Sequence, residues 1–147
     1  MRSGMTRIRR LTIGDCDEMI KLWERSSLPF KPKGRDSRQE IGRQMTVSPE
    51  LFLGAFEGRT LVGTVVGSYD GRKGWINRLA VDPDHRRQGV ARILIARIEN
   101  SLREKGARII AALVEESNLK SISLFEKLGY VTDRGILYLS KRESEDV

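Results

Sequence analysis

Apolar and polar positions in the first fifty residues predict one strand and two helices. The two kinds of side chain alternate over Thr6–Leu11, which indicates a short strand. After Asp15 and Glu18, a pair that resembles a capping box, apolar residues recur at helical spacing, so we expect a helix over 15–25. These apolar residues are Met19, Ile20, Leu22 and Trp23. A second short helix is expected over 36–46.

Three apolar runs between residues 51 and 81 predict an antiparallel β-meander. The runs are separated by Glu57-Gly58 and by Asp70-Gly71, and glycine after an acidic residue supplies the positive φ that tight hairpin turns require. The third strand is expected over Trp75–Val81, and it should end at Asp82-Pro83 because proline removes a hydrogen-bond donor from the ladder.

The second half of the chain predicts a helix, a buried strand, a short helix and a last strand. The first helix has one apolar face and is expected to end at a C-terminal cap formed by Gly106. The apolar face consists of Ala91, Leu94, Ile95, Ile98 and Leu102. Ile109–Val114 is continuously apolar, Leu119–Leu128 is a short helix closed by Gly129, and 135–140 is the final strand. This order predicts an α+β domain with one strand–helix–strand crossover.

Length and composition are typical of one globular domain covering residues 1–147. Hydrophobic residues make up 39% and charged residues 32%, and no apolar run approaches the ~20 residues of a membrane span. The basic N-terminus lacks the apolar region of a secretory signal, and the single Cys16 fits a reducing compartment, so we expect a cytoplasmic protein. Residues 1–4 are interpreted as vector-derived or disordered, and 142–147 as a flexible tail.

The charge balance favours an anionic partner without identifying it. Lysine and arginine number 27 against 20 acidic residues, which gives a formal charge of +7. A nucleic acid, an acidic membrane or a polyanionic small molecule would suit this surplus. The basic residues are mixed with acidic ones along the chain, however, and form no polybasic arm. No metal is expected, because the only histidine, His85, and the only cysteine are far apart in the sequence.

The stretch VDPDHRRQGVARIL, residues 81–94, has the layout of a diphosphate-binding turn. A strand leads into a turn and then into a helix, whose first N–H groups and dipole attract anions. Gly89 leaves the backbone bare at this point, and three arginines, Arg86, Arg87 and Arg92, add positive charge. The stretch matches neither G-x-G-x-x-G nor G-K-[ST], which disfavours dehydrogenases and magnesium-nucleotide enzymes.

These residues resemble a known family. R-R-Q-G-V-A, residues 86–91, matches the R/Q-x-x-G-x-G/A signature of the GCN5-related N-acetyltransferases (GNAT). N-R-L-A-V-D-P precedes it, Glu116-Ser117-Asn118 follows the next strand, and S-L-F-E-K-L-G-Y ends the next helix. The resemblance extends over roughly Leu51–Tyr130. The segments LWERSSL and VVGSYDG are similar to small bacterial YpeA-type members and to ribosomal-protein alanine acetyltransferases.

The resemblance implies a single-domain GNAT fold and an acetyl-CoA cosubstrate. The sheet would be mixed and mostly antiparallel, with a splayed parallel strand pair and flanking helices. The turn amides would hold the pyrophosphate, the strand before the turn would pair with the pantetheine arm, and an asparagine would lie beside that arm. The cofactor-binding residues implied in this way are Leu79, Ala80, Val81, Arg86, Arg87, Gln88, Gly89, Val90, Ala91, Arg92, Asn118 and Phe125.

The usual catalytic side chains of the family are missing from this sequence. The position of the general acid is Phe125, most simply a core residue, and the position of the general base is Leu113. Other groups that could transfer protons are Glu24, Asp70, Glu115, Glu116, Tyr69, Tyr130 and Tyr138. Of these we select Glu24, Glu116 and Tyr130 as the catalytic candidates. Three functions therefore stay open: an acetyltransferase that uses other groups, a non-catalytic acyl-CoA-binding sensor, and a nucleic-acid-binding protein, which we consider the weakest of the three.

The resemblance leaves the acceptor amine undetermined. The implied reaction is direct attack of a primary amine on acetyl-CoA in a ternary complex, and the candidates for the amine are a peptide or protein N-terminus, a lysine and a small molecule. The acceptor groove is expected among 26–46, 68–74 and 130–138. A group of basic residues near one wall, Lys31, Lys33, Arg35 and Arg38, favours an acidic acceptor. We expect no nucleic acid or membrane partner, and a homodimer is compatible with the family.

Overall fold

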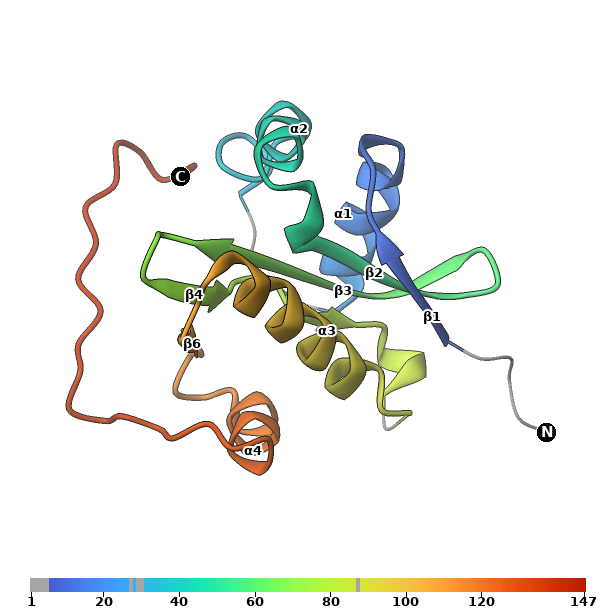
Figure 1. Ribbon diagram of the computed structural model, residues 1–147. Coiled ribbons are helices and arrows are strands. Elements are labelled where there is room, and N and C mark those ends of the chain that lie inside the picture. Colours follow the sequence, from blue (N-terminus) through green and yellow to red (C-terminus); the bar gives the residue numbers. More distant parts are fainter. Residues whose placement is uncertain (1–5, 27, 29–30, 87) are drawn as a thin grey trace.

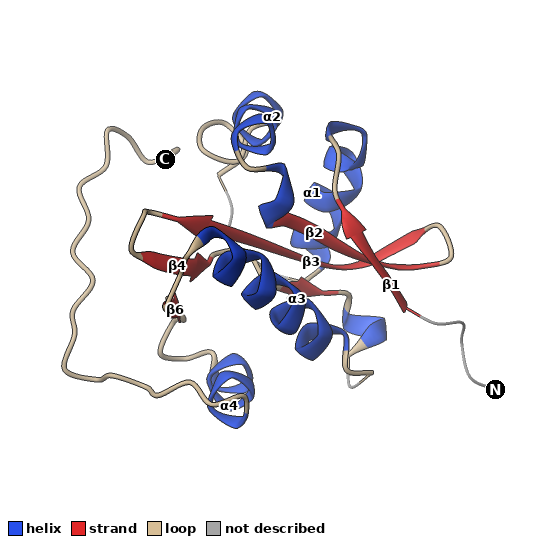
Figure 2. Ribbon diagram, viewed as in Figure 1, coloured by secondary structure: helices blue, strands red, loops and turns tan. Residues whose placement is uncertain are grey.

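A computed structural model describes residues 6–26, 28, 31–86 and 88–147. It consists of a twisted sheet with helices on both faces (Figures 1 and 2). Helices α1 (Cys16–Arg25) and α2 (Arg38–Val47) cover one face. Helix α3 (Val90–Lys105) crosses the other face, and α4 (Leu119–Lys127) packs near it. The layered α+β architecture expected from the sequence is confirmed.

The sheet is mixed, and its parallel pair lies at one edge. The strands follow the order β1-β2-β3-β4-β6, and β5 pairs separately with β3. All neighbours are antiparallel except β4 and β6. Their bounds are Thr6–Arg10 for β1, Phe52–Glu57 for β2, Thr60–Tyr69 for β3, Lys73–Ile76 for β4, Ala80–Val81 for β5 and Ile109–Ala112 for β6. Short 3₁₀ helices cover Ile13–Asp15, Pro49–Leu51 and Pro83–His85.

The side chains of β3 divide between two core clusters, one on each face of the sheet, and a shift in the register with β2 places Val62 and Val65 on the same face. Val62 and Val65 point to the cluster shared with α3, whereas Leu61 and Val66 point to the cluster shared with α1 and α2. On the second face the buried indole of Trp23 donates a hydrogen bond of 3.0 Å to the hydroxyl of Thr64. This bond satisfies a polar group in each partner and fixes α1 on the sheet.

A strip of bare backbone lets α3 lie close to the sheet. A Cβ atom on Gly63 would lie only 2.8 Å from a methyl carbon of Val90, and one on Gly67 would lie 3.0 Å from Ile98 Cγ1. At Gly74 of β4 the added atom would be 3.0 Å from a Leu102 methyl carbon. The three glycines therefore follow the length of α3, and the helix packs directly against the main chain.

The third strand of the meander differs from the prediction because a bulge interrupts it. The single strand expected over 75–81 is divided into β4 and β5 by residues 77–79. The carbonyl of Val66 accepts hydrogen bonds from the N–H groups of both Asn77 (2.7 Å) and Arg78 (3.4 Å). Asn77 and Arg78 thus both lie opposite Val66 of β3, and this bulge bends the strand and changes its direction.

The start of the first helix also differs from the prediction. The capping box joins Thr12 and Asp15, not Asp15 and Glu18, and α1 begins at Cys16 after a 3₁₀ turn. The carboxylate of Asp15 accepts from the Thr12 N–H at 2.7 Å and from Arg9 at 2.9 Å. Because the carboxylate of Asp15 is occupied by Thr12 and Arg9, it accepts no hydrogen bond from the N–H groups at the start of α1.

The predicted final strand over 135–140 is wrong for this structure. The segment is irregular, and its apolar side chains are exposed. An alternating or apolar pattern specifies the side chains of a strand, but a strand also needs a partner for its backbone, and within the described chain this segment has none.

We predict that Gly63→Ala lowers the free energy of unfolding by about 1–3 kcal/mol, because the new methyl overpacks the contact with Val90. Gly14→Ala is the matched control, since its nearest neighbour would be an ordinary 3.5 Å away. Urea denaturation of both variants measures the difference. Equal stabilities would show that α3 does not depend on the close approach.

Candidate functional site

The two parallel strands separate beyond Ile76. Their pairing runs from Lys73 opposite Ile109 to Ile76 opposite Ala112. After the bulge, β5 pairs with β3 instead, with Ala80 opposite Thr64. The chain after Ala112 continues without a strand partner in the described structure. The splay that the resemblance implied is therefore present, and it lies beside the residues expected to contact the pantetheine arm.

The turn at the start of α3 has the geometry expected of an anion-binding site. Gly89 is the N-cap, with φ 78° and ψ 11°, a left-handed conformation that glycine adopts without strain. The N–H groups of Val90, Ala91 and Arg92 have no acceptor among the residues described here. Free N–H groups at a helix N-terminus attract anions through hydrogen bonds and the helix dipole.

Most predicted side chains of this turn are solvent-exposed. Arg86, Gln88, Gly89 and Arg92 are exposed, Val90 is buried against the sheet, and Ala91 is intermediate. Arg87 lies outside the described residues.

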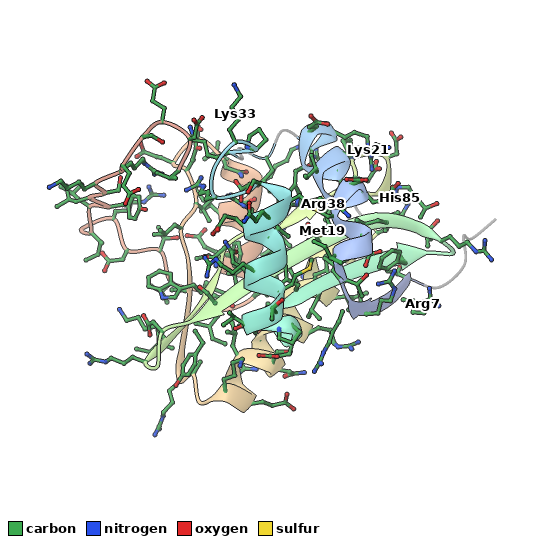
Figure 3. All side chains as sticks on the ribbon, turned by 90° about the horizontal axis from the view of Figure 1, so that it is seen from above. Arg7, Met19, Lys21, Lys33, Arg38 and His85 are labelled. Carbon is green, nitrogen blue, oxygen red and sulfur yellow. The ribbon has the colours of Figure 1, made fainter. Side chains whose placement is uncertain are left out.

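A carboxylate joins the turn to α1. Asp82 Oδ2 accepts hydrogen bonds from Arg25 Nη2 at 2.8 Å and Nε at 3.2 Å, and Oδ1 accepts from the Asp84 N–H at 2.9 Å. Burial would raise the pKa of Asp82, but the bonds from Asp84 and Arg25 outweigh it and hold the pKa below its usual value. His85 is half-buried between Asp82 and Glu57, at 3.8 and 3.7 Å (Figure 3).

A second ion pair joins the bulge to the loop before α2. Arg78 Nη2 lies 2.7 Å from the buried carboxylate of Asp36, which also accepts the Lys31 N–H at 2.6 Å. Two of the basic residues proposed for an acidic acceptor are paired: Arg35 with Asp36 at 3.6 Å, and Arg38 with Asp17 at 3.0 Å (Figure 3). The positive charge available on this wall is therefore smaller than the sequence indicates.

Sequence reasoning missed Asp36, Arg78, Arg25 and Asp82 as positioning residues. The partners are 42 and 57 positions apart, and no local pattern connects them. In the sequence Asp82 marks only the end of a strand, and Asp36 only the start of the helix expected over 36–46.

The positions after β6 have structural roles that are compatible with a binding role. Asn118 caps α4, and its side-chain carbonyl accepts the Ser121 N–H at 3.2 Å. Phe125 is buried in the α3 cluster and packs edge-to-face on Tyr130, with ring centroids 4.9 Å apart. Leu113 is 61% exposed. The core role expected for Phe125 is confirmed.

The three catalytic candidates lie on different elements. Glu24 on α1 and Glu116 after β6 are exposed, and the Tyr130 hydroxyl donates a 2.5 Å hydrogen bond to Glu99 on α3. Burial and the negative charge of Glu99 raise the pKa of Tyr130. No hydrogen bond or ion pair joins any two of Glu24, Glu116 and Tyr130, all of which the structure describes.

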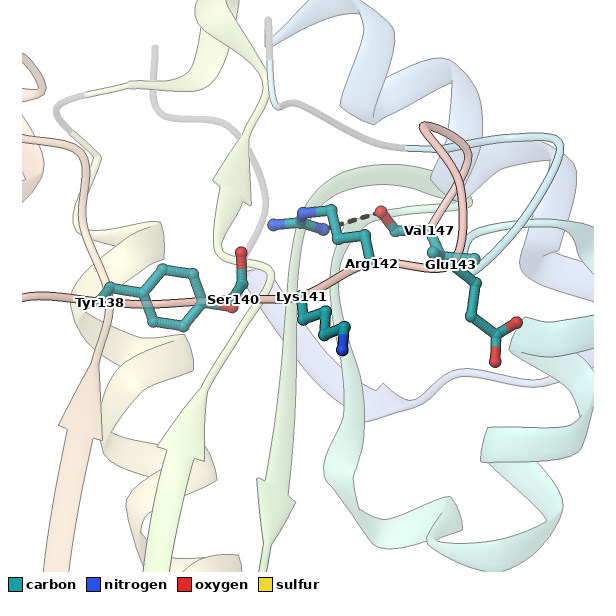
Figure 4. Close-up of a pocket in the computed structure, with 6 residues that line it drawn as sticks. All are labelled: Tyr138, Ser140, Lys141, Arg142, Glu143 and Val147. Atoms are coloured by element: carbon teal, nitrogen blue, oxygen red, sulfur yellow. Dashed lines mark hydrogen bonds between the residues drawn. The ribbon is translucent and has the colours of Figure 1, made fainter.

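Two cavities differ in their relation to this site. One of about 250 Å³ lies between α2 and the end of β3, beside the bulge, and is lined by residues that include Arg43, Gln44, Val66, Ser68 and Asn77. The other, of about 430 Å³, is formed by the C-terminal segment alone (Figure 4). Only the first adjoins a strand of the candidate site, so we regard it as the relevant one.

The described residues contain neither a cluster of metal-ligating side chains nor a helix fit to span a membrane. Groups of three or more His, Cys, Asp or Glu that could bind a metal are absent from that part of the chain. None of its helices is both long and apolar enough for a bilayer.

A splayed parallel pair and a glycine-capped helix N-terminus are the features that the resemblance to the GNAT class implied, and residues 16–130 match the model of the acetyltransferase (GNAT) family. The chain belongs to this family, whose members are acetyl-CoA-dependent N-acetyltransferases, and the enzyme class expected from the sequence is confirmed. It is 39% identical over 139 residues to an acetyltransferase of Sodalis glossinidius, covering 95% of this chain and 96% of the relative.

Solved structures agree on the fold. The PaiA N-acetyltransferase of Thermoplasma acidophilum, in complex with coenzyme A, is similar with a TM-score of 0.77 at 21% identity, over 88% of this chain and 92% of that one. The ribosomal-protein-S18-alanine N-acetyltransferase of Escherichia coli has a TM-score of 0.68 at 22% identity, over 85% and 77%.

We predict that Arg25→Gln destabilises the protein at pH 7 and that the difference from the parent disappears as the pH falls below about 4. The folded pKa of Asp82 lies below its unfolded value, so its contribution exists above the unfolded pKa and is lost as pH falls through the folded pKa. Urea titrations at several pH values measure this. The exposed pair Arg43–Glu40 supplies the control variant, Arg43→Gln, which should have a smaller effect. If the difference in unfolding free energy between Arg25→Gln and the parent did not depend on pH, the proposed role of the Asp82 carboxylate would be contradicted.

Proposed function

We propose that this acetyltransferase moves the acetyl group to a primary amine by direct attack, with acetyl-CoA and the amine bound at the same time. The observation that carries the proposal is the placement of free amides at the start of α3 next to the splay of β4 and β6. The amides at the start of α3 could bind the diphosphate of the cofactor, and the backbone exposed at the splay could pair with its extended arm. An elongated cofactor requires these two binding features to lie next to each other.

In this proposal the main chain does most of the cofactor binding. The amides of Gln88 to Arg92 hold the pyrophosphate, and Arg86, Arg87 and Arg92 add positive charge around it. The backbone of Leu79, Ala80 and Val81 pairs with the pantetheine arm, with the amide of Asn118 and the ring of Phe125 nearby. An N–H group on this strand polarises the thioester carbonyl, where negative charge grows as the amine attacks.

Proton transfer in the proposed reaction uses groups other than the family's usual pair. The amine arrives mostly as ammonium and must lose a proton before attack. Glu24 and Glu116 have exposed carboxylates that can accept this proton through water. Tyr130 could protonate the leaving thiolate only after leaving Glu99. A free thiol has a pKa of about 8.5, so the thiolate can also leave without a dedicated acid.

The acceptor that we favour is the amine of a peptide or protein, at its N-terminus or on a lysine. The solved relative from Escherichia coli is named for alanine of a ribosomal protein, and the cavity beside Asn77 opens next to the bulge. Lys31 and Lys33 on the loop before α2 suit an acidic sequence around that amine. A small amine is the second possibility for the same site.

We predict that Gly89→Val lowers the affinity for CoA by about tenfold or more, equivalent to about 1.4 kcal/mol. The side chain would both strain the left-handed N-cap and stand over the amides. Gly58→Val is the matched control, because Gly58 also has positive φ and open space around it but lies in the β2–β3 turn. Both variants should lose about 1–2 kcal/mol of stability. If calorimetric titration gave equal CoA affinities for the two variants, the turn at Gly89 would not be part of the binding site.

We also predict release of free thiol from acetyl-CoA, above the hydrolysis blank, with at least one amine of a mixed panel. The panel contains acidic and cationic peptides with free N-termini, lysine peptides and small polyamines, and acidic peptides should react fastest. Tight CoA binding without release for any member would favour the alternative of a non-catalytic acyl-CoA sensor, for which the apolar Phe125 and Leu113 are the supporting observation.

A further inference from the structure

The cavity of about 250 Å³ between α2 and the end of β3, which we name the α2 pocket, lies on the face of the sheet opposite α3 (Figure 1). Its lining includes Phe52 and Val66, which belong to the core cluster shared with α1 and α2. Asn77, in its wall, precedes Leu79 by two positions, so their Cα atoms lie within about 7 Å of each other. The α2 pocket is therefore next to the strand that holds the pantetheine arm in the proposed function.

Helix α3 blocks an approach to this strand from the opposite face. An added Cβ on Gly67 would lie 3.0 Å from Ile98 Cγ1, and one on Gly74 would lie 3.0 Å from a Leu102 methyl carbon. The backbone of β3 and β4 thus touches the side chains of α3 and leaves no space for another chain. An acceptor amine reaches the thioester from the face on which the α2 pocket lies.

The size of the α2 pocket suits one amino-acid side chain. Sites for drug-sized ligands occupy about 300–1,000 Å³, and this cavity of about 250 Å³ is smaller than that range. A whole oligosaccharide or a long polyamine would therefore extend well outside it.

The α2 pocket offers apolar and neutral polar contacts. Gln44, Ser68 and Asn77 contribute two amides and a hydroxyl, and Asn77 Nδ2 donates a 3.0 Å hydrogen bond to Ser68 Oγ. The one charged residue among the described lining residues, Arg43, is paired with Glu40 at 2.8 Å. Those lining residues include no carboxylate, so a cationic side chain in the pocket would lose water without gaining an ionic partner.

We propose that the α2 pocket binds the side chain of the first residue of an acceptor peptide and selects uncharged side chains. This inference rests on the proposed function and deepens it, because it chooses the peptide N-terminus among the possible amines. The carbon next to an α-amine carries a side chain, which enters the pocket while the amine attacks the thioester. The carbon next to a lysine Nζ carries no branch, so a lysine acceptor leaves the pocket empty.

Peptides that share an acidic remainder and differ only in the first residue test the selection. We expect kcat/KM to be about tenfold or more higher for alanine or methionine than for glycine, since one added methyl in a fitting pocket has at least this effect. Peptides that begin with lysine or aspartate, an acetyl-capped peptide with one lysine, and a polyamine should all react more slowly than the alanine peptide.

Equal rates for all first residues, or faster acetylation of the capped lysine peptide or the polyamine, would overturn the α2 pocket as the selecting site and leave the acetyl transfer standing. Bound CoA without transfer to any amine would instead contradict the proposed function, and the inference would fall with it.

A charge placed in the α2 pocket should change the selection. Gln44→Glu keeps the size of the side chain, and it should raise the ratio of kcat/KM for lysine-first over alanine-first peptides about threefold at low salt, as expected of a partly exposed ion pair. Gln39→Glu is the matched control, because Gln39 lies on the same helix but is exposed and outside the lining. Equal ratios in the two variants would contradict the proposal.

Filling the α2 pocket should remove the selection. Ser68→Leu places a larger side chain in the lining, so the preference for methionine over glycine should disappear while the glycine peptide is still acetylated. Thr60→Leu, at the other end of β3 and equally exposed, is the control and should keep the preference. A Ser68→Leu variant that still prefers methionine would place the selecting site elsewhere.

Discussion

The contact between α3 and the glycine backbone of β3 and β4 determines where the site can be. Gly63, Gly67 and Gly74 have no side chains that would hold the helix away, and Val90, in the first turn of α3, packs over Gly63. The free amides of that turn therefore lie at the end of β5, next to the separation of the parallel strands. A larger residue in this strip would move the helix and, with it, the proposed phosphate site.

Two ion pairs fix the parts of the site that lie outside helices and strands. Arg25 and Asp82 join α1 to the strand end before the turn, and Arg78 and Asp36 join the bulge to the loop before α2. In each pair one partner is buried and accepts additional backbone N–H groups, so the carboxylate fixes a loop as well as balancing a charge. The bulge, the turn and the loop before α2 are thus held relative to one another by residues far apart in sequence.

The sequence predicts the features that local chemistry determines. The periodicity of α3, the turn glycines of the meander and the glycine-capped turn at Gly89 each need only neighbouring residues, and they were predicted correctly. The bulge after Ile76 and the buried pair of Arg78 with Asp36 depend on contacts between distant segments, which no local pattern contains. The cap at Thr12 is local, but Asp15 also matches a capping box with Glu18, and the sequence pattern does not decide between the two. The segment 135–140 is the clearest case, because its side chains are those of a strand while no strand of the described structure pairs with it.

The absence of the family's usual acid and base is easier to understand in a site built mainly from backbone. In the proposed site the amides would bind the cofactor whatever the neighbouring side chains are, so a buried Phe125 would not disturb the binding surface. The most direct test of this account is a crystal structure of the protein with CoA. It should place pyrophosphate oxygens within about 2.7–3.2 Å of the amide nitrogens of Val90, Ala91 and Arg92. A pyrophosphate bound elsewhere, with those amides facing solvent, would contradict it.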